Sequence, residues 1–214
     1  MVKLVIFDWD GTLFDSIDNI CHSMLQAGQL ANAPKRAKDD IKNIIGLSLD
    51  KAIDTVWPEL SSAEQAAIIE HYKTIYVAAD QTPPLAYPGV IDMLNKLQDS
   101  GIKMAVATGK SRRGLERVMS LTNTNHYFVA SRCADEALSK PHPLMLEQIL
   151  EELNILPEHA VMIGDTEYDL NMATNAGMKS IGVTYGAHEE ERLKACLPHA
   201  VIDNFNQLPH FLGL

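Results

Sequence analysis

The chain has 214 residues, 46% of them hydrophobic, which is enough to bury one large core or a core with an inserted domain. Its 28 acidic and 18 basic residues give a formal net charge of −10, which argues against a surface that binds nucleic acid or anionic membranes. The three cysteines, Cys21, Cys133 and Cys196, are widely spaced and odd in number. We therefore expect neither a disulfide framework nor a thiolate metal site.

The N-terminal segment predicts a protein without a membrane partner. It has one lysine and a short apolar run before Asp8, which is too short for the hydrophobic region of a signal peptide. No segment approaches the length that a membrane-spanning helix needs. With no disulfide pattern either, we expect a cytoplasmic protein.

The first apolar run, Lys3–Phe7, has the character of a buried strand and is followed by Asp8-Trp9-Asp10-Gly11-Thr12. Side chains two residues apart on a strand project to the same face, so Asp8 and Asp10 could converge on one ligand. Two carboxylates that close repel each other, and a divalent cation or a shared proton relieves the repulsion. Taken alone, the pair also fits a simple solvated turn, because Asp-Gly is a common turn dipeptide.

The stretch from Asp15 to Leu85 lacks strand signals, and its apolar residues recur at helical spacing. Ser61 and Glu64 form a capping-box signature ahead of one of these helical stripes. The insertion starts directly after the acidic strand end and closes at Thr82-Pro83-Pro84, which predicts a helical cap over that strand end. A bundle packed elsewhere is the alternative, but both ends of the insertion must lie near the strand ends.

The rest of the chain alternates between short apolar runs and segments with helical spacing, such as Leu144–Asn154 and Tyr168–Ala176. This alternation is typical of an α/β fold with a doubly wound parallel sheet. We assign residues 1–14 and 86–214 to this α/β core and residues 15–85 to an inserted all-helical cap. The further predicted strands are Lys103–Thr108, Tyr127–Ser131, Ala160–Gly164 and Ser180–Thr184.

Polar groups follow several of these strands, at the edge of the sheet where open α/β folds bind ligands. Thr108-Gly109-Lys110-Ser111 ends the second run, and Gly164-Asp165-Thr166 leads into Asp169 after the fourth. Ser139-Lys140-Pro141 precedes the helix that starts near Pro143.

These motifs, in this order, resemble those of the haloacid dehalogenase superfamily of phosphatases, and within it the phosphoglycolate-phosphatase-like group with a helical cap. A single Asp-x-Asp is weak evidence, whereas four ordered motifs at strand ends are strong. The resemblance covers the whole chain and implies a Rossmann-like α/β core. The motifs are Asp8 to Leu13, with Trp9 where Phe is more usual, then Thr108-Gly109, Lys140-Pro141, and Gly164-Asp165-Thr166 with Asp169.

The resemblance implies a role for each residue. Asp8 would attack phosphorus and form an aspartyl-phosphate, and Asp10 would protonate the leaving group and later take a proton from water. Thr108, the N–H of Gly109 and the charge of Lys140 would hold the phosphoryl oxygens.

Magnesium is the implied metal, because the site offers hard oxygen ligands and no cluster of His or Cys. Asp8 and Asp165 would bind Mg²⁺ by their side chains and Asp10 by its main-chain carbonyl. Asp169 falls at the start of a helix, where a carboxylate is favourable without any metal. We expect Asp169 to bind through water or to support the ligands, with a pure capping role as the alternative.

Several of these residues have simpler alternative roles. Thr108 could be the N-cap of a helix over Ser111–Leu121, and Lys140 could be a surface lysine. Arg112 and Arg113 are expected to be solvated. The turn Gly46-Leu47-Ser48 between two cap helices is either a substrate-specificity loop or an ordinary helix connection.

The predicted function is a Mg²⁺-dependent phosphatase for a small phosphorylated metabolite, such as phosphoglycolate or a sugar phosphate. Phosphosugar mutase and pyrophosphatase activities share the same motifs and stay open. A non-catalytic aspartyl-phosphate switch is less favoured, because receivers of that kind lack a cap. The sequence does not indicate an oligomeric state.

Overall fold

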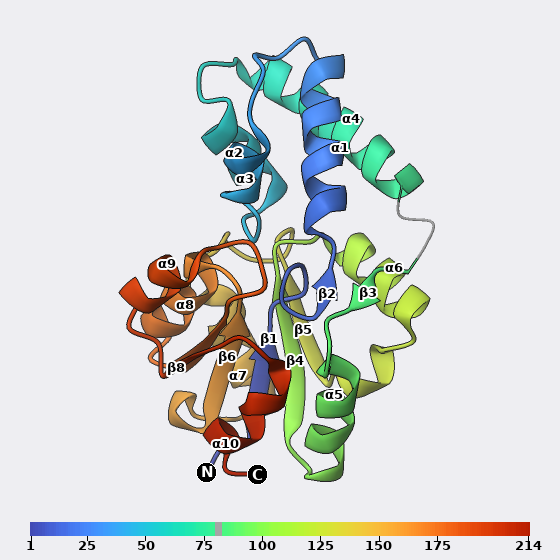
Figure 1. Cartoon of the computed structure of the whole chain (residues 1–214). Coiled ribbons are helices and arrows are strands. Elements are labelled where there is room, and N and C mark those ends of the chain that lie inside the picture. The colour runs from blue at the N-terminus through green and yellow to red at the C-terminus, as the bar shows by residue number, and fades with distance from the viewer. Residues whose placement is uncertain (80–82) are drawn as a thin grey trace.

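A six-stranded parallel sheet lies at the centre of the protein, with strand order β5-β4-β1-β6-β7-β8 (Figure 1). The structure, a computed structural model, describes residues 1–79 and 83–214. The first strand is central, because β4 pairs with one side of it and β6 with the other. The strands are β1 Leu4–Phe7, β4 Lys103–Thr108, β5 Ala130–Cys133, β6 Ala160–Gly164, β7 Lys179–Val183 and β8 Ala200–Ile202.

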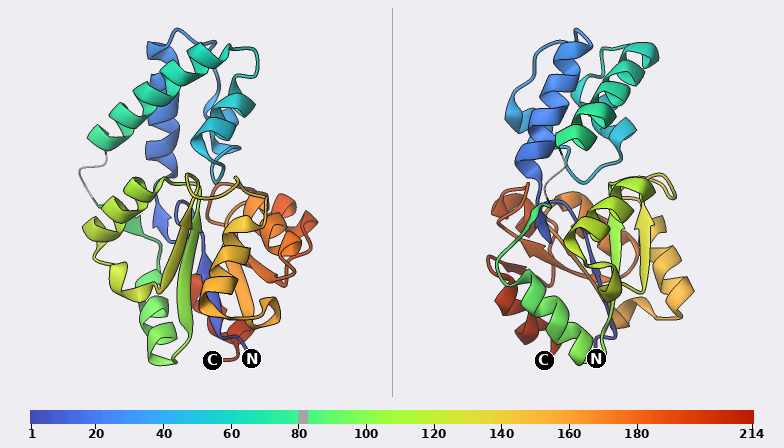
Figure 2. Two further views of the ribbon diagram at one scale, coloured as in Figure 1. Left: turned by 180° about the vertical axis from the view of Figure 1, so that it is seen from behind. Right: turned by 90° about the vertical axis from the view of Figure 1, so that its right-hand side faces the viewer.

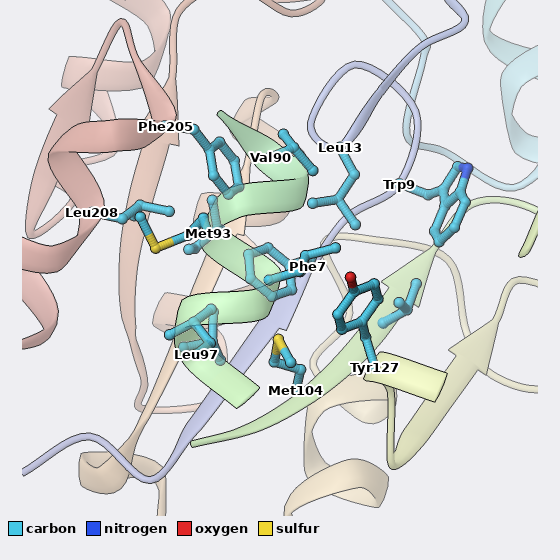
Figure 3. Close-up of a cluster of buried hydrophobic side chains, with 14 of the residues drawn as sticks. Phe7, Trp9, Leu13, Val90, Met93, Leu97, Met104, Tyr127, Phe205 and Leu208 are labelled. Carbon is cyan, nitrogen blue, oxygen red and sulfur yellow. The ribbon is translucent and has the colours of Figure 1, made fainter. Parts of the chain in front are cut away.

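Helices cover both faces of the sheet (Figure 2). Along β1, Val5 and Phe7 join one buried cluster and Leu4 and Ile6 join another, as strand alternation requires. Figure 3 shows the first cluster, in which Phe7 lies among side chains of the helix that follows β3. The helices are α5 Val90–Asp99, α6 Arg112–Thr122, α7 Leu144–Leu153, α8 Glu167–Asn175, α9 Glu190–Ala195 and α10 Leu208–Leu212, with 3-10 turns η1 Asn125–Tyr127, η2 Pro157–His159 and η3 Phe205–Gln207.

Four helices inserted after β1 form a separate unit with its own apolar core, and we call them the helical unit. They lie above the carboxyl ends of the strands (Figures 1 and 2). A two-stranded antiparallel ribbon joins the two units, with Phe14 opposite Ala86. The elements are α1 Ile17–Leu30, α2 Lys38–Lys42, α3 Leu49–Val56 and α4 Ser62–Ala79, with ribbon strands β2 Phe14–Asp15 and β3 Leu85–Ala86.

The doubly wound α/β fold is therefore confirmed. The exact domain boundaries stay a prediction, and Thr82 of the predicted closing segment lies outside the described residues. Within the part of the chain that the structure describes, no helix is long and apolar enough to span a membrane.

Two local predictions need correction, and one strand is absent from the predicted set. The strand expected at Tyr127–Ser131 lies later, at Ala130–Cys133, because residues 125–127 form a 3-10 turn instead. Strand β8 was not predicted, since it has only three residues. Ser111 rather than Thr108 caps α6, because the Ser111 hydroxyl accepts a hydrogen bond from the N–H of Gly114.

Candidate active site

Three carboxylates from two strand ends meet beneath the helical unit. Strand β1 pairs with β6 so that Phe7 lies opposite Ile163; Asp8 directly follows Phe7, and Asp165 follows the last residue of β6, Gly164. Asp8, Asp165 and Asp169 each offer an oxygen within 4.8 Å of the others, and all three side chains are buried. The parallel register thus brings together residues that are far apart in sequence.

Each of the two later carboxylates is fixed by hydrogen bonds. Asp165 accepts one from the Thr12 hydroxyl at 2.7 Å and one from the N–H of Ala187 at 2.7 Å. Asp169 accepts from the N–H and hydroxyl of Thr166 in a capping box at the start of α8. Its position is therefore set by the helix terminus.

Lys140 provides the positive charge of this cluster. Its Nζ lies 2.9 Å from Asp8 Oδ1 and 2.7 Å from Asp169 Oδ1. The lysine is 1% exposed, so the alternative of a surface lysine is wrong. Desolvating a lysine is costly unless it is paired, and the two carboxylates supply that pairing. Although burial opposes it, Asp169 and Asp8 raise the pKa of Lys140 above its usual range.

Asp8 differs from its neighbours in having unused acceptors. Its contact with Lys140 is an ion pair without hydrogen-bond geometry, and neither oxygen has a hydrogen-bond partner among the described residues. Buried carboxylate oxygens are rarely left in this state. They are free to face an electrophile or a cation.

The cluster carries more negative than positive charge. Burial raises the pKa of Asp8 well above its usual range, and Asp169 and Asp165 add to the effect while Lys140 opposes it. Burial, together with Asp169, raises the pKa of Asp165 to about 7. Three converging carboxylates with one lysine leave negative charge and hard oxygen donors that fit a divalent cation such as Mg²⁺.

Asp10 lies beside this cluster and is also shielded from solvent, so the solvated-turn interpretation of the pair is wrong. Its Oδ1 accepts a hydrogen bond from the Ser16 hydroxyl and lies 3.0 Å from Lys110 Nζ. Gly11 directly follows Asp10 and has a φ of +80°. A Cβ at this position would overlap the Asp165 carboxylate. Only glycine allows the chain to turn here.

The end of β4 brings Thr108 and Gly109 to the same edge of the sheet. Val106 pairs with Phe7, so Thr108 lies just beyond the level of Asp8, and its side chain is fully buried. The Thr108 hydroxyl accepts from the N–H of Lys110 at 3.2 Å. This places a hydroxyl and a glycine backbone beside the first strand's acids.

The turn Gly46-Leu47-Ser48 of the helical unit is seated directly on this strand end. A Cβ on Gly109 would lie 2.6 Å from the Leu47 carbonyl oxygen and 2.7 Å from that of Gly46. The N–H of Ser48 donates to the Ser139 hydroxyl at 2.9 Å. The turn therefore lies against the strand end that carries Thr108 and Gly109.

Arg112 and Arg113, which the sequence predicts to be solvated, lie apart from the site. Arg112 pairs with Glu136 at 2.7 Å and donates to Ser131, and Arg113 is exposed. Neither has a contact with the acidic cluster among the described residues.

Sequence reasoning missed Lys110 and Ser16 as partners of Asp10. Lys110 belongs to the motif Thr108-Gly109-Lys110-Ser111. Its position two residues after a strand end is the only sequence feature that suggests it lies near the site. Although burial opposes it, the Asp10 carboxylate raises the pKa of Lys110 above its usual range, and Tyr76 adds to this. Ser16 has no sequence signal, since the intervening turn decides whether it reaches Asp10.

Comparison with known proteins agrees with this geometry. Residues 5–183 match the family model described as haloacid dehalogenase-like hydrolase. "Probable phosphatase IndB" of Dickeya dadantii is 34% identical, covering 97% of this chain and 92% of that protein. A phosphoglycolate phosphatase of Vibrio vulnificus is 30% identical, covering 97% and 94%. A crystal structure of a "predicted phosphatase" from Clostridium acetobutylicum superposes with a TM-score of 0.89 at 27% identity, covering 100% of both chains. The chain belongs to the haloacid dehalogenase-like hydrolase family, and within it to the phosphatases that resemble phosphoglycolate phosphatase.

Proposed function

We propose that the protein is a Mg²⁺-dependent phosphatase that acts on a small phosphorylated metabolite through an aspartyl-phosphate. One observation carries the proposal: Asp8 is a buried carboxylate with no hydrogen-bond partner among the described residues, and it lies beside Lys140. A carboxylate held in this way is suited to attack an anionic electrophile whose charge the lysine offsets.

The proposed reaction has two displacements at phosphorus. In the first, an Asp8 oxygen bonds to phosphorus, the ester P–O bond breaks, and the leaving alkoxide takes a proton from Asp10. In the second, Asp10 takes a proton from water, the water oxygen bonds to phosphorus, and the Asp8–phosphorus bond breaks. Inorganic phosphate leaves, and both carboxyl groups return to their initial states.

The equatorial phosphoryl oxygens would be bound by the Thr108 hydroxyl, the N–H of Gly109 and Lys140, because these donors lie at the strand ends next to Asp8. We assign Mg²⁺ to the Asp8 and Asp165 side chains and the Asp10 carbonyl, where it would neutralise phosphoryl charge. Asp169 already bonds Lys140 and Thr166, which favours a supporting role over direct metal binding.

We further propose that residues 15–85 act as a cap that encloses the substrate. The contact between the Gly46-Leu47 turn and Gly109 supports this, since it closes the helical unit over the phosphate-binding strand end. The named relatives favour phosphoglycolate or a similarly small ester as substrate, and a cytoplasmic location fits such a metabolite. A mutase or a pyrophosphatase could use the same residues.

A phosphate-release screen over a panel of metabolites, with Mg²⁺ and with chelator, tests the proposal. We expect turnover of at least one small phosphate ester with Mg²⁺ and none with chelator. Free phosphate as product supports a phosphatase, whereas an isomeric phosphate ester without free phosphate indicates a mutase. A stoichiometric, long-lived phosphoprotein would contradict catalysis.

A further inference from the structure

The last helix of the helical unit contacts Lys110 of the α/β core. Lys110 Nζ donates to the Tyr76 hydroxyl at 3.0 Å and lies 4.9 Å from the centre of the Tyr76 ring. Arg117 of α6 lies 6.0 Å from the same ring centre. Tyr76 is buried, although it belongs to a helix that is largely exposed at its C-terminal end. The α/β core thus receives Tyr76 between two of its cations.

Lys110 connects this contact to the acid that the proposed reaction needs. The same Nζ lies 3.0 Å from Asp10 Oδ1, and the side chains of the pair are only 9% and 11% exposed. A lysine has a long flexible side chain, so a fixed geometry requires a partner that limits its rotamers. Tyr76 is that partner, since it supplies both an acceptor and a rigid ring.

The other end of the insertion reaches the same oxygen. Ser16 directly precedes α1, and its hydroxyl donates to Asp10 Oδ1. Within residues 1–79 and 83–214, no hydrogen bond reaches Asp10 Oδ2. One end of the helical unit therefore contacts Asp10 Oδ1 directly through Ser16, and the other end acts on the same oxygen indirectly, because Tyr76 contacts Lys110. Oδ2 is left for proton exchange.

We propose that Tyr76 is a positioning residue for Asp10: by holding Lys110 against Oδ1 when the helical unit is seated, it directs Oδ2 toward the leaving group and the attacking water. This inference rests on the proposed phosphatase function. It makes the proton-transfer group dependent on the seating of α4, a helix that contributes no other part of the proposed machinery. Proton transfer then occurs efficiently only when the site is closed.

The Tyr76→Phe variant tests the proposal, because it keeps the ring and removes the hydroxyl. A phenolate leaving group needs little protonation, whereas the water attack needs Asp10 with every substrate. With 4-nitrophenyl phosphate, we expect the first-turnover release of nitrophenol to be unchanged. Steady-state kcat should fall about tenfold, the size expected for one misplaced contact, while kcat/KM, which reports the unchanged first step, stays within about twofold, so that KM falls together with kcat.

Tyr168→Phe is the matched control. It removes a tyrosine hydroxyl that crosses the same interface, where it donates to the Asn43 carbonyl at 3.0 Å. We expect this variant to keep the wild-type ratio of first-turnover rate to kcat. Three results would overturn the proposal. The two variants could show the same kinetic pattern, the first-turnover rate of Tyr76→Phe could fall together with kcat, or its kcat could be unchanged.

A crystal structure of Tyr76→Phe separates this inference from the proposed function. We expect Lys110 Nζ to leave Asp10 Oδ1 and the Asp10 side chain to rotate. An unchanged contact would contradict the positioning role whether or not the protein is an active phosphatase. Failure of the wild type to release phosphate from any ester would instead contradict the proposed function.

Discussion

Lys140 and Asp169 form an ion pair of 2.7 Å in which neither side chain is exposed to solvent. The pair links the third motif to the first turn of α8, and the same ammonium group reaches Asp8 at 2.9 Å. One cation therefore serves both the proposed nucleophile and the carboxylate that supports it.

Lys140→Met should destabilise the protein by about 3 to 5 kcal/mol in metal-free buffer, because it leaves buried carboxylates without a partner. Urea unfolding with and without Mg²⁺ measures this, and the loss should be smaller with Mg²⁺. Asp169→Asn is the matched control: it keeps an acceptor for Thr166 and leaves Lys140 its contact with Asp8. Equal losses for the two variants would rule out this charge balance.

Stability without metal should fall as pH rises through the acidic cluster's titration. The pKa of Asp165 is raised from 3.8 to about 7, so the folded protein holds a proton that the unfolded chain releases at lower pH. The folded state thus binds more protons between about pH 4 and about pH 7, and its stability decreases across that window. Mg²⁺ must displace the proton, so its apparent affinity should rise over the same range.

Thermal unfolding at about pH 5 and about pH 8, in chelator and in Mg²⁺, checks this linkage. The stabilisation by Mg²⁺ should be larger at the higher pH. Asp165→Asn removes the titrating group and should lose most of the pH-dependent difference. A metal-free melting temperature with the same pH dependence in wild type and Asp165→Asn would contradict the assignment.

Gly109→Ala should weaken the contact between the helical unit and the end of β4. The new Cβ would lie 2.6 Å from the Leu47 carbonyl oxygen, so the turn must move away. We expect kcat/KM to fall at least about tenfold while the melting temperature changes little, since the strain falls between the two units. Gly114→Ala in the first turn of α6 is the control, where a Cβ meets the Ser111 hydroxyl at 3.3 Å and Lys110 Cβ at 3.9 Å but, among the described residues, no backbone atom outside its own helix. If Gly109→Ala keeps wild-type kinetics, the turn does not enclose the substrate.

The acidic cluster could be predicted because its members follow strands whose carboxyl ends meet at one edge of a parallel sheet. Local motifs placed Asp8 and Asp165 at those ends, and Lys140 just before the helix that starts near Pro143, without any knowledge of side-chain contacts. The partners of Asp10 could not be predicted in this way. Lys110 contacts Tyr76, which is 34 residues away on another unit, and no periodicity encodes that contact.

The errors in the sheet have a similar origin. Tyr127 favours a strand by its intrinsic preference, but its hydroxyl donates to Asn95 at 2.7 Å and its backbone belongs to a 3-10 turn. Tertiary contacts therefore moved the start of β5 to Ala130. The three residues of β8 gain their strand geometry from pairing with β7, which a single short segment cannot signal.

Acid quenching during turnover of a phosphate ester, followed by mass spectrometry of the peptides, tests the central claim most directly. We predict one phosphoryl group on the peptide that contains Asp8, and loss of both this adduct and turnover in Asp8→Asn. Full turnover by Asp8→Asn, or a phosphoryl group on a different residue, would contradict the account.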